Sequence, residues 1–154
     1  MVFDRRLLRV YVANTAGNSV SIINADRNSA NFLAVTTVPV GLAPTSVTAL
    51  ADGSRAYVAN SGSNTVSVIN TLNNTVMRTV TVGTAPLSVG SAPDSSRVYA
   101  ANSGSNNTSI IRTSDDTVLL NVLAPKRDFN CVDPAPPALP TCPRQDPRFI
   151  IVTP

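Results

Sequence analysis

The fold is decided by residues 57–70, Tyr-Val-Ala-Asn-Ser-Gly-Ser-Asn-Thr-Val-Ser-Val-Ile-Asn. Two short runs rich in β-branched residues flank a polar turn at residues 61–64, and such runs suit a pleated, half-buried surface. Gly62 in this turn can take a positive φ, and the flanking asparagines tolerate it better than most residues. The stretch therefore predicts a β-hairpin.

The same pattern occurs three times in the chain. Tyr11 lies 46 residues before Tyr57 and Tyr99 lies 42 residues after it, and each tyrosine run is followed by a polar turn and a second alternating run. A period of this length is typical of propeller blades. The period and the scarcity of good helix formers exclude leucine-rich and helical repeats.

Two further runs complete each unit. A third strand is expected at residues 32–38, 75–82 and 117–123, and a fourth run follows the linkers Gly41-Leu-Ala-Pro44 and Gly83-Thr-Ala-Pro86. Four short antiparallel strands per period predict a β-propeller blade. We therefore predict an all-β fold of propeller blades with four antiparallel strands each, in an array over residues 1–124 with units near residues 8–43, 44–85 and 86–124.

The repeating motifs resemble a known family. The tyrosine strand, the Ser-Gly-Ser-Asn turn, the Val-Ser-Val-Ile-Asn strand and the Val-Gly-x-x-Pro linker are similar to the YVTN family of β-propeller repeats, over residues 8 to about 123. The resemblance implies a radial propeller, often seven-bladed, with binding surfaces rather than a shared catalytic centre. It also implies an extracytoplasmic location, because the family occurs in surface-layer and other secreted or periplasmic proteins of bacteria and archaea.

The predicted array is incomplete. The first unit starts directly at its second strand, so we expect it to lack an inner strand, and about three blades are fewer than the four to eight of closed propellers. Three explanations stay open: a fragment of a longer propeller, two copies that close a six-bladed ring, or an open array with capped ends. Exposed strand edges pair with other chains, which favours the first two explanations.

The composition changes at Pro125, since eight of the twelve prolines lie in residues 125–154. Proline removes a backbone donor and fixes φ, so this segment is predicted to be a Pro-rich tail and not a fourth blade. Cys131 and Cys142 are candidates for a disulfide in an oxidising compartment. The apolar run at residues 148–153 is a candidate closing strand that would supply the missing inner strand of the first blade.

The residue types present exclude several functions. The chain has no His, which removes Ser-His-Asp and Cys-His catalysis, and no Glu, so no catalytic residue of the related-looking propeller lactonases can be carried over. Two cysteines alone do not make a zinc site, and we expect no metal and no cofactor. Scattered cations without stacking aromatics argue against nucleic-acid binding. We find neither a membrane-spanning run nor the pattern of a signal peptide.

Three recurring asparagines are candidates for a binding face. Asn14, Asn60 and Asn102 each close a tyrosine strand, so a propeller would place them at equivalent turns. The alternative is a local role, in which each amide hydrogen-bonds its own turn.

Arginines recur just before the tyrosine strands. We expect Arg55 and Arg97 to stabilise the turns that contain Asp52 and Asp94.

The function that these patterns favour is a non-catalytic binding or structural module of an extracytoplasmic or cell-surface protein, with blade-edge loops as the contact surface. Its partner is an unknown protein or glycan, and self-association is one way to complete the ring. The alternative is a fragment of a propeller enzyme of the lactonase type.

Overall fold

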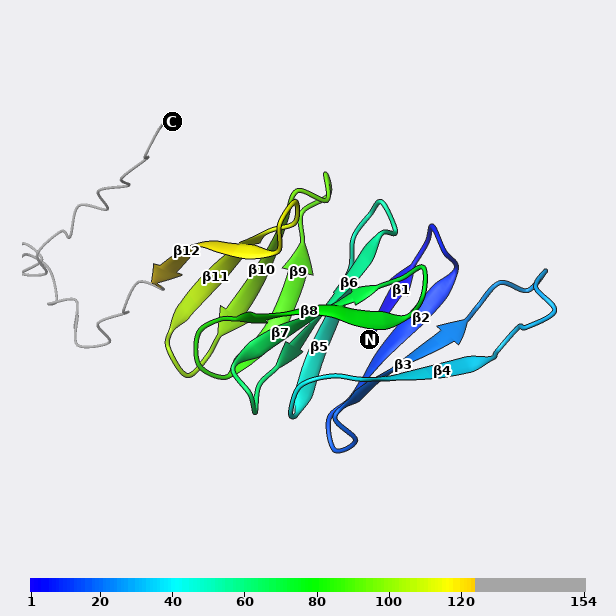
Figure 1. The fold of residues 1–154 in the computed structure, drawn as a ribbon, viewed down its shortest axis with the longest axis horizontal. Coiled ribbons are helices and arrows are strands. Elements are labelled where there is room, and N and C mark those ends of the chain that lie inside the picture. The colour runs from blue at the N-terminus through cyan, green and yellow to red at the C-terminus, as the bar shows by residue number, and fades with distance from the viewer. Residues whose placement is uncertain (124–154) are drawn as a thin grey trace, which may run out of the picture. The chain divides into compact units, whose positions relative to one another are not determined.

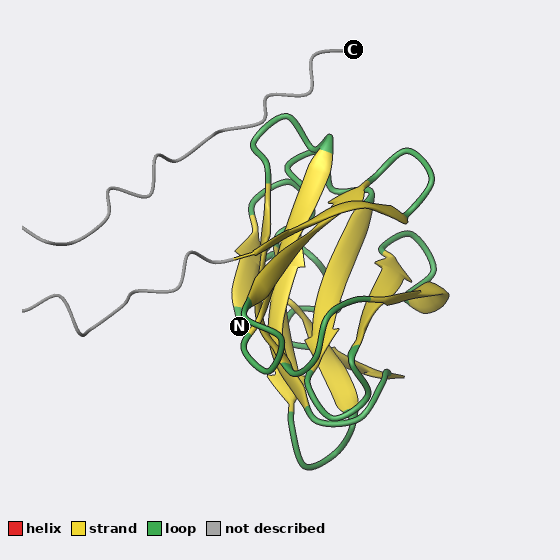
Figure 2. Cartoon of the chain, turned by 90° about the vertical axis from the view of Figure 1, so that its left-hand side faces the viewer, coloured by secondary structure: helices red, strands yellow, loops and turns green. Residues whose placement is uncertain are grey.

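The computed structural model describes residues 1–123, which form twelve strands and no helix (Figures 1 and 2). The predictions for the Pro-rich tail, the Cys131–Cys142 disulfide and the closing strand at residues 148–153 lie outside the described residues. The strands are β1 (Val2–Asp4), β2 (Arg9–Asn14), β3 (Ser19–Asn24), β4 (Val35–Pro39), β5 (Pro44–Ala49), β6 (Arg55–Asn60), β7 (Thr65–Asn70), β8 (Thr75–Thr81), β9 (Pro86–Ser91), β10 (Arg97–Asn102), β11 (Asn107–Arg112) and β12 (Thr117–Leu123).

The strands form three antiparallel sheets of four strands, one for each repeat. We call them the first sheet (β1 to β4), the middle sheet (β5 to β8) and the third sheet (β9 to β12). Within each sheet the strands pair in chain order, and Figure 1 shows the three sheets following one another. The predicted all-β fold of four-stranded antiparallel units is confirmed.

The hairpin that decides the fold forms in the expected register. Strands β6 and β7 pair from Arg55 opposite Asn70 to Asn60 opposite Thr65. The positive φ of the turn falls on Asn64, at 57°, and on its counterparts Asn18 and Asn106, and not on the neighbouring glycines. Asparagine tolerates this conformation better than most residues. Oδ1 of Asn64 also accepts a hydrogen bond from the Ala85 amide at 2.9 Å, in the linker to the next sheet.

The first sheet corrects one expectation. We expected its inner strand to be missing, but Val2–Asp4 forms β1 and pairs with β2. A strand of three residues is too short to show an alternating pattern in the sequence. Its end is fixed by Asp4, whose carboxylate accepts hydrogen bonds from the Arg6 and Leu7 amides in the turn that follows.

The core lies on both faces of the middle sheet. One cluster joins Tyr11, Val20 and Ile22 of the first sheet to Val58 and Ile69 of the middle sheet. A second cluster joins alternate residues of the middle sheet to the third sheet, with these members: Tyr57, Ala59, Val66, Val68, Val89, Val98 and Ile111. Successive strand residues point to opposite faces, so the middle sheet is apolar on both. Burial between neighbouring sheets therefore holds the array together.

Each linker packs on the turn of the sheet that follows it. A Cβ on Gly83 would lie 2.6 Å from Nδ2 of Asn102 and 2.5 Å from Oδ1 of Asn107. Gly41 has the same relation to Asn60 in the middle sheet. Glycine is needed at both linkers because the backbone passes too close to these amides for any side chain.

Candidate functional site

Charged residues are segregated along the strands of residues 1–123. Eight arginines and six aspartates occur there, and all except Arg78, in the middle of β8, lie at the sheet ends that carry the turns β1–β2, β3–β4, β5–β6, β7–β8, β9–β10 and β11–β12. We call these ends the charged rim. The opposite ends, residues 15–18, 61–64 and 103–106 with linkers 40–43 and 82–85, contain no charged residue, and we call them the neutral rim.

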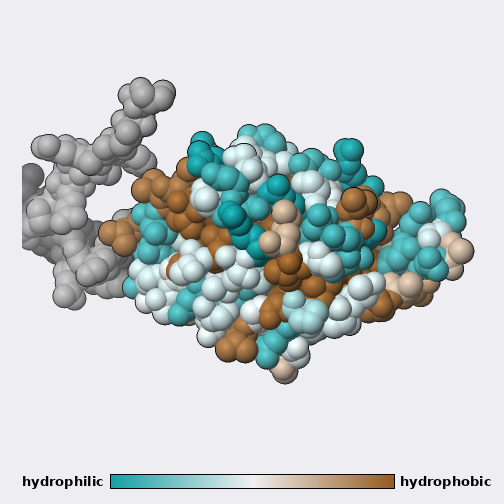
Figure 3. Space-filling view, in the orientation of Figure 1, coloured by the Kyte–Doolittle hydropathy of each residue, from teal (hydrophilic) through white to brown (hydrophobic). Residues whose placement is uncertain are grey.

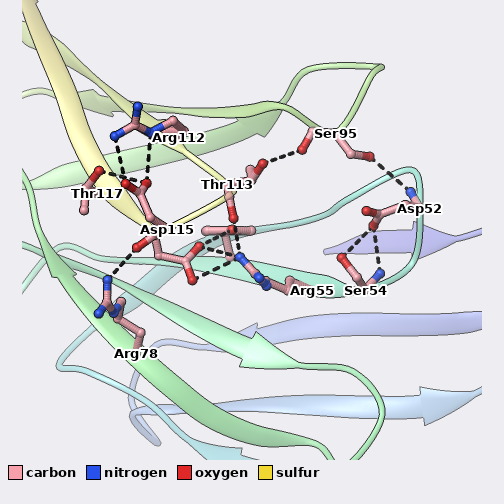
Figure 4. Close-up of polar contacts among 11 residues, drawn as sticks. Asp52, Ser54, Arg55, Arg78, Ser95, Arg112, Thr113, Asp115 and Thr117 are labelled. Carbon is pink, nitrogen blue, oxygen red and sulfur yellow. Dashed lines mark hydrogen bonds and ion pairs between the residues drawn. The ribbon is translucent and has the colours of Figure 1, made fainter.

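The charged rim contains a polar network between the middle and third sheets (Figure 4). Nη1 of Arg55 donates to the Thr113 carbonyl and lies 3.0 Å from Oδ1 of Asp116. The Tyr57 phenol donates to the same carboxylate at 2.5 Å. This arrangement corrects the expectation for Arg55, which bridges to the next sheet and does not pair with Asp52. The Asp52 carboxylate instead accepts hydrogen bonds from Ser54 within its own turn.

The same network exists in weaker form between the first and middle sheets. Arg9 donates to the Thr71 carbonyl at 2.6 Å and to Oδ1 of Asn74 at 3.2 Å. Asn74 therefore occupies the place of Asp116. The buried Tyr11 phenol has no hydrogen-bond partner among the described residues.

These groups are poorly suited to acid–base catalysis. Burial, followed by the hydrogen bond to Asp116, raises the pKa of the Tyr57 phenol, and burial followed by the nearby charge of Asp4 raises the pKa of the Tyr11 phenol. Both phenols are therefore neutral at physiological pH and act as donors or not at all. Two clefts of about 310 and 460 Å³ lie beside Arg9, but the Arg9 guanidinium already donates a hydrogen bond to the Thr71 carbonyl of the middle sheet.

Of the adjacent acidic pair in the β11–β12 turn, only one member is exposed. Asp115 forms a surface ion pair with Arg112 at 2.8 Å, and this hydrogen-bonded guanidinium lowers the pKa of Asp115. Asp116 is 6% exposed and belongs to the interface network. The two neighbouring aspartates therefore have different roles.

The three predicted binding-face asparagines lie at the neutral rim, but mostly below its surface. Asn60 is 0% and Asn102 is 2% exposed, and Nδ2 of each donates to two side chains of its own hairpin at 2.7 to 3.1 Å. Asn14 is partly exposed and donates in the same way to Ser19 and Ser21. The local role accounts for these contacts. A role in binding stays a prediction. One feature of the structure bears on it, a hollow beside Asn102.

This hollow has a volume of about 270 Å³ and lies at the neutral rim of the third sheet. It is lined only by uncharged residues: Leu87, Ala101, Asn102, Ser103, Asn106, Asn107 and Thr108. Oδ1 of Asn102 is buried and has no hydrogen-bond partner among residues 1–123, and the same holds for Oδ1 of Asn60 in the middle sheet. We take this hollow as the candidate functional site.

The corresponding places on the other two sheets are occupied by the chain itself. In the middle sheet, Oδ1 of Asn64 accepts from the Ala85 amide at 2.9 Å and Oγ1 of Thr45 donates to the Pro86 carbonyl at 3.1 Å. In the first sheet, Oδ1 of Asn18 accepts from the Ala43 amide at 2.8 Å and Thr15 donates to the Pro44 carbonyl. Asn106 is the equivalent residue of the third sheet, so the hollow beside it has the shape of a binding site for an extended Ala-Pro segment.

Sequence reasoning missed the role of Asn18, Asn64 and Asn106, although a signal was present. These asparagines recur at the last position of each hairpin turn, with the same spacing as the tyrosines. No cluster of His, Cys, Asp or Glu in the described part of the chain could hold a metal ion. A search of those residues for a helix long and apolar enough to cross a membrane finds none.

Comparison with known proteins supports the fold. No family model and no curated protein matches the chain. Among solved structures, hydrazine synthase of Kuenenia stuttgartiensis matches with a TM-score of 0.68 and 28% identity, over 73% of this chain and 32% of that one. Apo AztD of Citrobacter koseri matches with a TM-score of 0.65 and 8% identity, over 79% of this chain and 33% of that one.

A third match is the dihydro-heme d1 dehydrogenase NirN, with a TM-score of 0.66 and 18% identity, over 82% of this chain and 27% of that one. These neighbours are β-propeller proteins. The chain therefore spans about a third of the length of the propeller structures that it matches.

Proposed function

We propose that this chain is a non-catalytic binding module built from YVTN-type propeller repeats, and that it binds an extended, uncharged peptide segment of a partner protein at the neutral rim. The observation that carries the proposal is the hollow beside Asn106. On both other sheets the corresponding place is filled by a linker that ends in Ala-Pro.

The lining of the hollow specifies the chemistry of its ligand. Oδ1 of Asn106 is an acceptor at the position where Asn18 and Asn64 receive a backbone N–H. Leu87 and Ala101 add apolar surface, and no lining residue is charged. Burying a charged side chain there would cost free energy that no nearby group could offset. A peptide supplies the required N–H at a fixed spacing, which favours a protein partner over a glycan.

The same structure supports a non-catalytic role. The interior ionisable groups, Arg55, Tyr57 and Asp116, are used to hold two sheets together. At the neutral rim, residues 15–18, 40–43, 61–64, 82–85 and 103–106 offer no general acid or base. An enzyme needs such groups beside the substrate.

The location that we propose is extracytoplasmic, and it rests on the resemblance of the repeats to the YVTN family. It can be tested by immunoblotting envelope, secreted and cytoplasmic fractions of cells that express the full-length gene. Signal confined to the cytoplasm would overturn this part of the proposal and leave peptide binding untouched.

Peptide binding can be tested with a labelled probe taken from the chain itself, a synthetic peptide with the sequence of residues 81–88. We expect its fluorescence anisotropy to rise on addition of the chain, and a scrambled peptide to bind more weakly. Asn106→Gly removes the acceptor and keeps a residue that tolerates the local φ of 49°, so it should weaken binding by roughly fivefold.

The matched control is Ser95→Gly, which also replaces a residue of positive φ in the third sheet, but at the charged rim. It should leave peptide binding unchanged. Equal binding of the probe and the scrambled peptide, or equal loss in both variants, would overturn the proposal. Binding of neutral glycans on an array with no peptide binding would assign the hollow to a sugar.

A second candidate function is part of a larger propeller enzyme of the lactonase type. The observation in its favour is that two matched structures carry the names of enzymes, hydrazine synthase and a dihydro-heme d1 dehydrogenase, and that the matched part makes up only 32% and 27% of those chains. Hydrolysis of a simple lactone by the purified chain would favour this candidate over the binding module.

A further inference from the structure

The third sheet has one face that no other described sheet covers. It carries Tyr99, Ile110 and Leu120, which lie opposite one another on neighbouring strands, and we call it the open tyrosine face. The corresponding tyrosine of the middle sheet, Tyr57, is 0% exposed because the third sheet packs on it, whereas Tyr99 is 40% exposed. Figure 3 shows apolar side chains gathered around β12, at this end of the array.

The first sheet has the opposite kind of uncovered face. Its members are Val10, Val12, Ile23, Val35 and Phe3, and we call it the open valine face. The equivalent face of the middle sheet carries Ala56, Val58 and Ile69, all buried against the tyrosine face of the first sheet. One chain thus presents both halves of the interface that it already forms twice internally.

The two uncovered faces also match in side-chain volume. Inside the array, Oγ1 of Thr48 lies 3.2 Å from Oγ of Ser91, so these two strand positions are neighbours across an interface. At the open ends, register places Gly90 at the position of Thr48, opposite a tyrosine, and Phe3 at the position of Ser91.

Gly90 leaves free space, because a Cβ built on it would meet no atom within 4 Å. Phe3 is a large side chain, 49% exposed, where the other sheets have alanine and serine. The smallest residue and the largest residue therefore stand at the two positions that would meet.

We propose that the open tyrosine face packs on the open valine face of a second copy of this chain, head to tail, with Phe3 of one copy over Gly90 of the other. The contact is heterologous, so it either closes a ring of copies or extends them in a line. The proposal does not depend on peptide binding at the neutral rim. Ala101 and Thr108 of the hollow lie on the open tyrosine face, two residues from Tyr99 and Ile110, so a bound peptide and a second copy would compete for this end of the face.

The polar part of this contact is weaker than the internal ones. Arg97 stands where Arg55 and Arg9 stand, and each of those donates to a carbonyl of the next sheet. The corresponding carbonyl in the first sheet is that of Ala25. The Ala25 amide donates a hydrogen bond to a carbonyl of the preceding turn of its sheet, as the Thr71 and Thr113 amides do, which identifies the three residues as equivalent. Leu33 takes the positive φ that Asn74 and Asp116 have and offers no acceptor. We therefore expect a reversible, concentration-dependent association.

The sharpest test is cross-linking between two different variants of the full chain. Cys131→Ser and Cys142→Ser remove the native thiols, and Gly90→Cys is then mixed with Phe3→Cys under mild oxidation. The proposal expects a covalent dimer from this mixture. A mixture of Gly90→Cys with Leu72→Cys is the control, because Leu72 is 90% exposed and lies on the β7–β8 turn, away from both open faces.

The second measurement is sedimentation velocity over a wide range of concentration. The unmodified chain should shift to a larger species as concentration rises, and Gly90→Tyr, which fills the space for Phe3, should shift that transition at least tenfold upward. Circular dichroism should show that the variant keeps its strands, since Gly90 faces open space. A monomer at every concentration, or cross-linking that is no faster than in the control, would overturn the proposal. So would a transition unaffected by Gly90→Tyr.

Discussion

The Tyr57 phenol donates a hydrogen bond to Oδ1 of Asp116 at 2.5 Å, and the two residues belong to neighbouring sheets. Arg55 reaches the same carboxylate at 3.0 Å. Between the first and middle sheets, Asn74 stands in the place of Asp116, and the Tyr11 phenol is unpaired among residues 1–123. At this position one interface of the array thus has a carboxylate and the other an amide, so the contribution of the carboxylate can be compared within one molecule.

Asp116→Ala should destabilise the array by about 2–3 kcal/mol, because it leaves a buried phenol and a partly buried guanidinium without their acceptor. Asp116→Asn keeps an acceptor, as Asn74 does, and should lose less. The measurement is the urea unfolding midpoint followed by circular dichroism. Asp115→Asn is the control: its ion pair with Arg112 is on the surface, so its midpoint should hardly move. Equal effects at the two aspartates would contradict the assignment.

Replacing the two tyrosines by phenylalanine should have opposite effects. Tyr57→Phe removes a hydrogen bond to a charged group and should cost about 1–2 kcal/mol. Tyr11→Phe removes a buried hydroxyl that has no partner among residues 1–123, and stability should stay the same or rise by up to ~1 kcal/mol. Urea unfolding of both variants checks this prediction, and a similar loss in both would mean that the Tyr11 phenol is paired in solution.

Stability should fall in alkali because of the same two phenols. Their pKa values are raised above the ordinary 10.0, chiefly by burial, so the folded chain keeps both protons at a pH where the unfolded chain has lost them. The stabilising contribution is complete below about pH 10 and is lost as the pH rises further, by at most about 1.4 kcal/mol per pH unit for each phenol, and only while the folded chain still holds that proton.

The measurement is a series of urea unfolding curves above about pH 9, with the phenolate absorbance recorded in parallel. Tyr57→Phe should show a shallower loss of stability with pH than the unmodified chain. An unchanged slope would show that Tyr57 does not control the alkaline transition.

The fold was predictable because its signals are local. The alternating runs around Tyr57, the polar turn at residues 61–64 and the spacing of Tyr11 and Tyr99 specify hairpins and their repetition without reference to any distant residue. Strand β1 was missed for the same reason, since Val2–Asp4 is too short to display a period. What marks it as a strand is its pairing with β2, which is a tertiary property.

The contacts between sheets could not be predicted as well. Arg55 was expected to pair with Asp52, three residues away, but it bonds Asp116, which lies 61 residues away on the next sheet. Sequence proximity favours the nearer carboxylate, and only the stacking of the sheets brings the farther one closer. The hollow beside Asn106 was likewise hidden, because its meaning comes from the linkers that fill the equivalent places on the other sheets.

Two glycines of the third repeat should respond oppositely to alanine. A Cβ on Gly83 would overlap Oγ of Ser105 and lie 2.6 Å from Nδ2 of Asn102, so Gly83→Ala should force the linker away from the turn and cost roughly 1–3 kcal/mol. Gly90 lies in the interior of β9 with free space around it, so Gly90→Ala should be neutral or stabilise by up to about 1 kcal/mol through the lower backbone entropy of the unfolded chain. Urea unfolding midpoints of the two variants decide the matter. A loss of stability at Gly90 equal to that at Gly83 would mean that the space beside β9 is occupied in solution. The occupant would then be a neighbour other than the described sheets, and the sedimentation and cross-linking measurements would test whether it is a second copy.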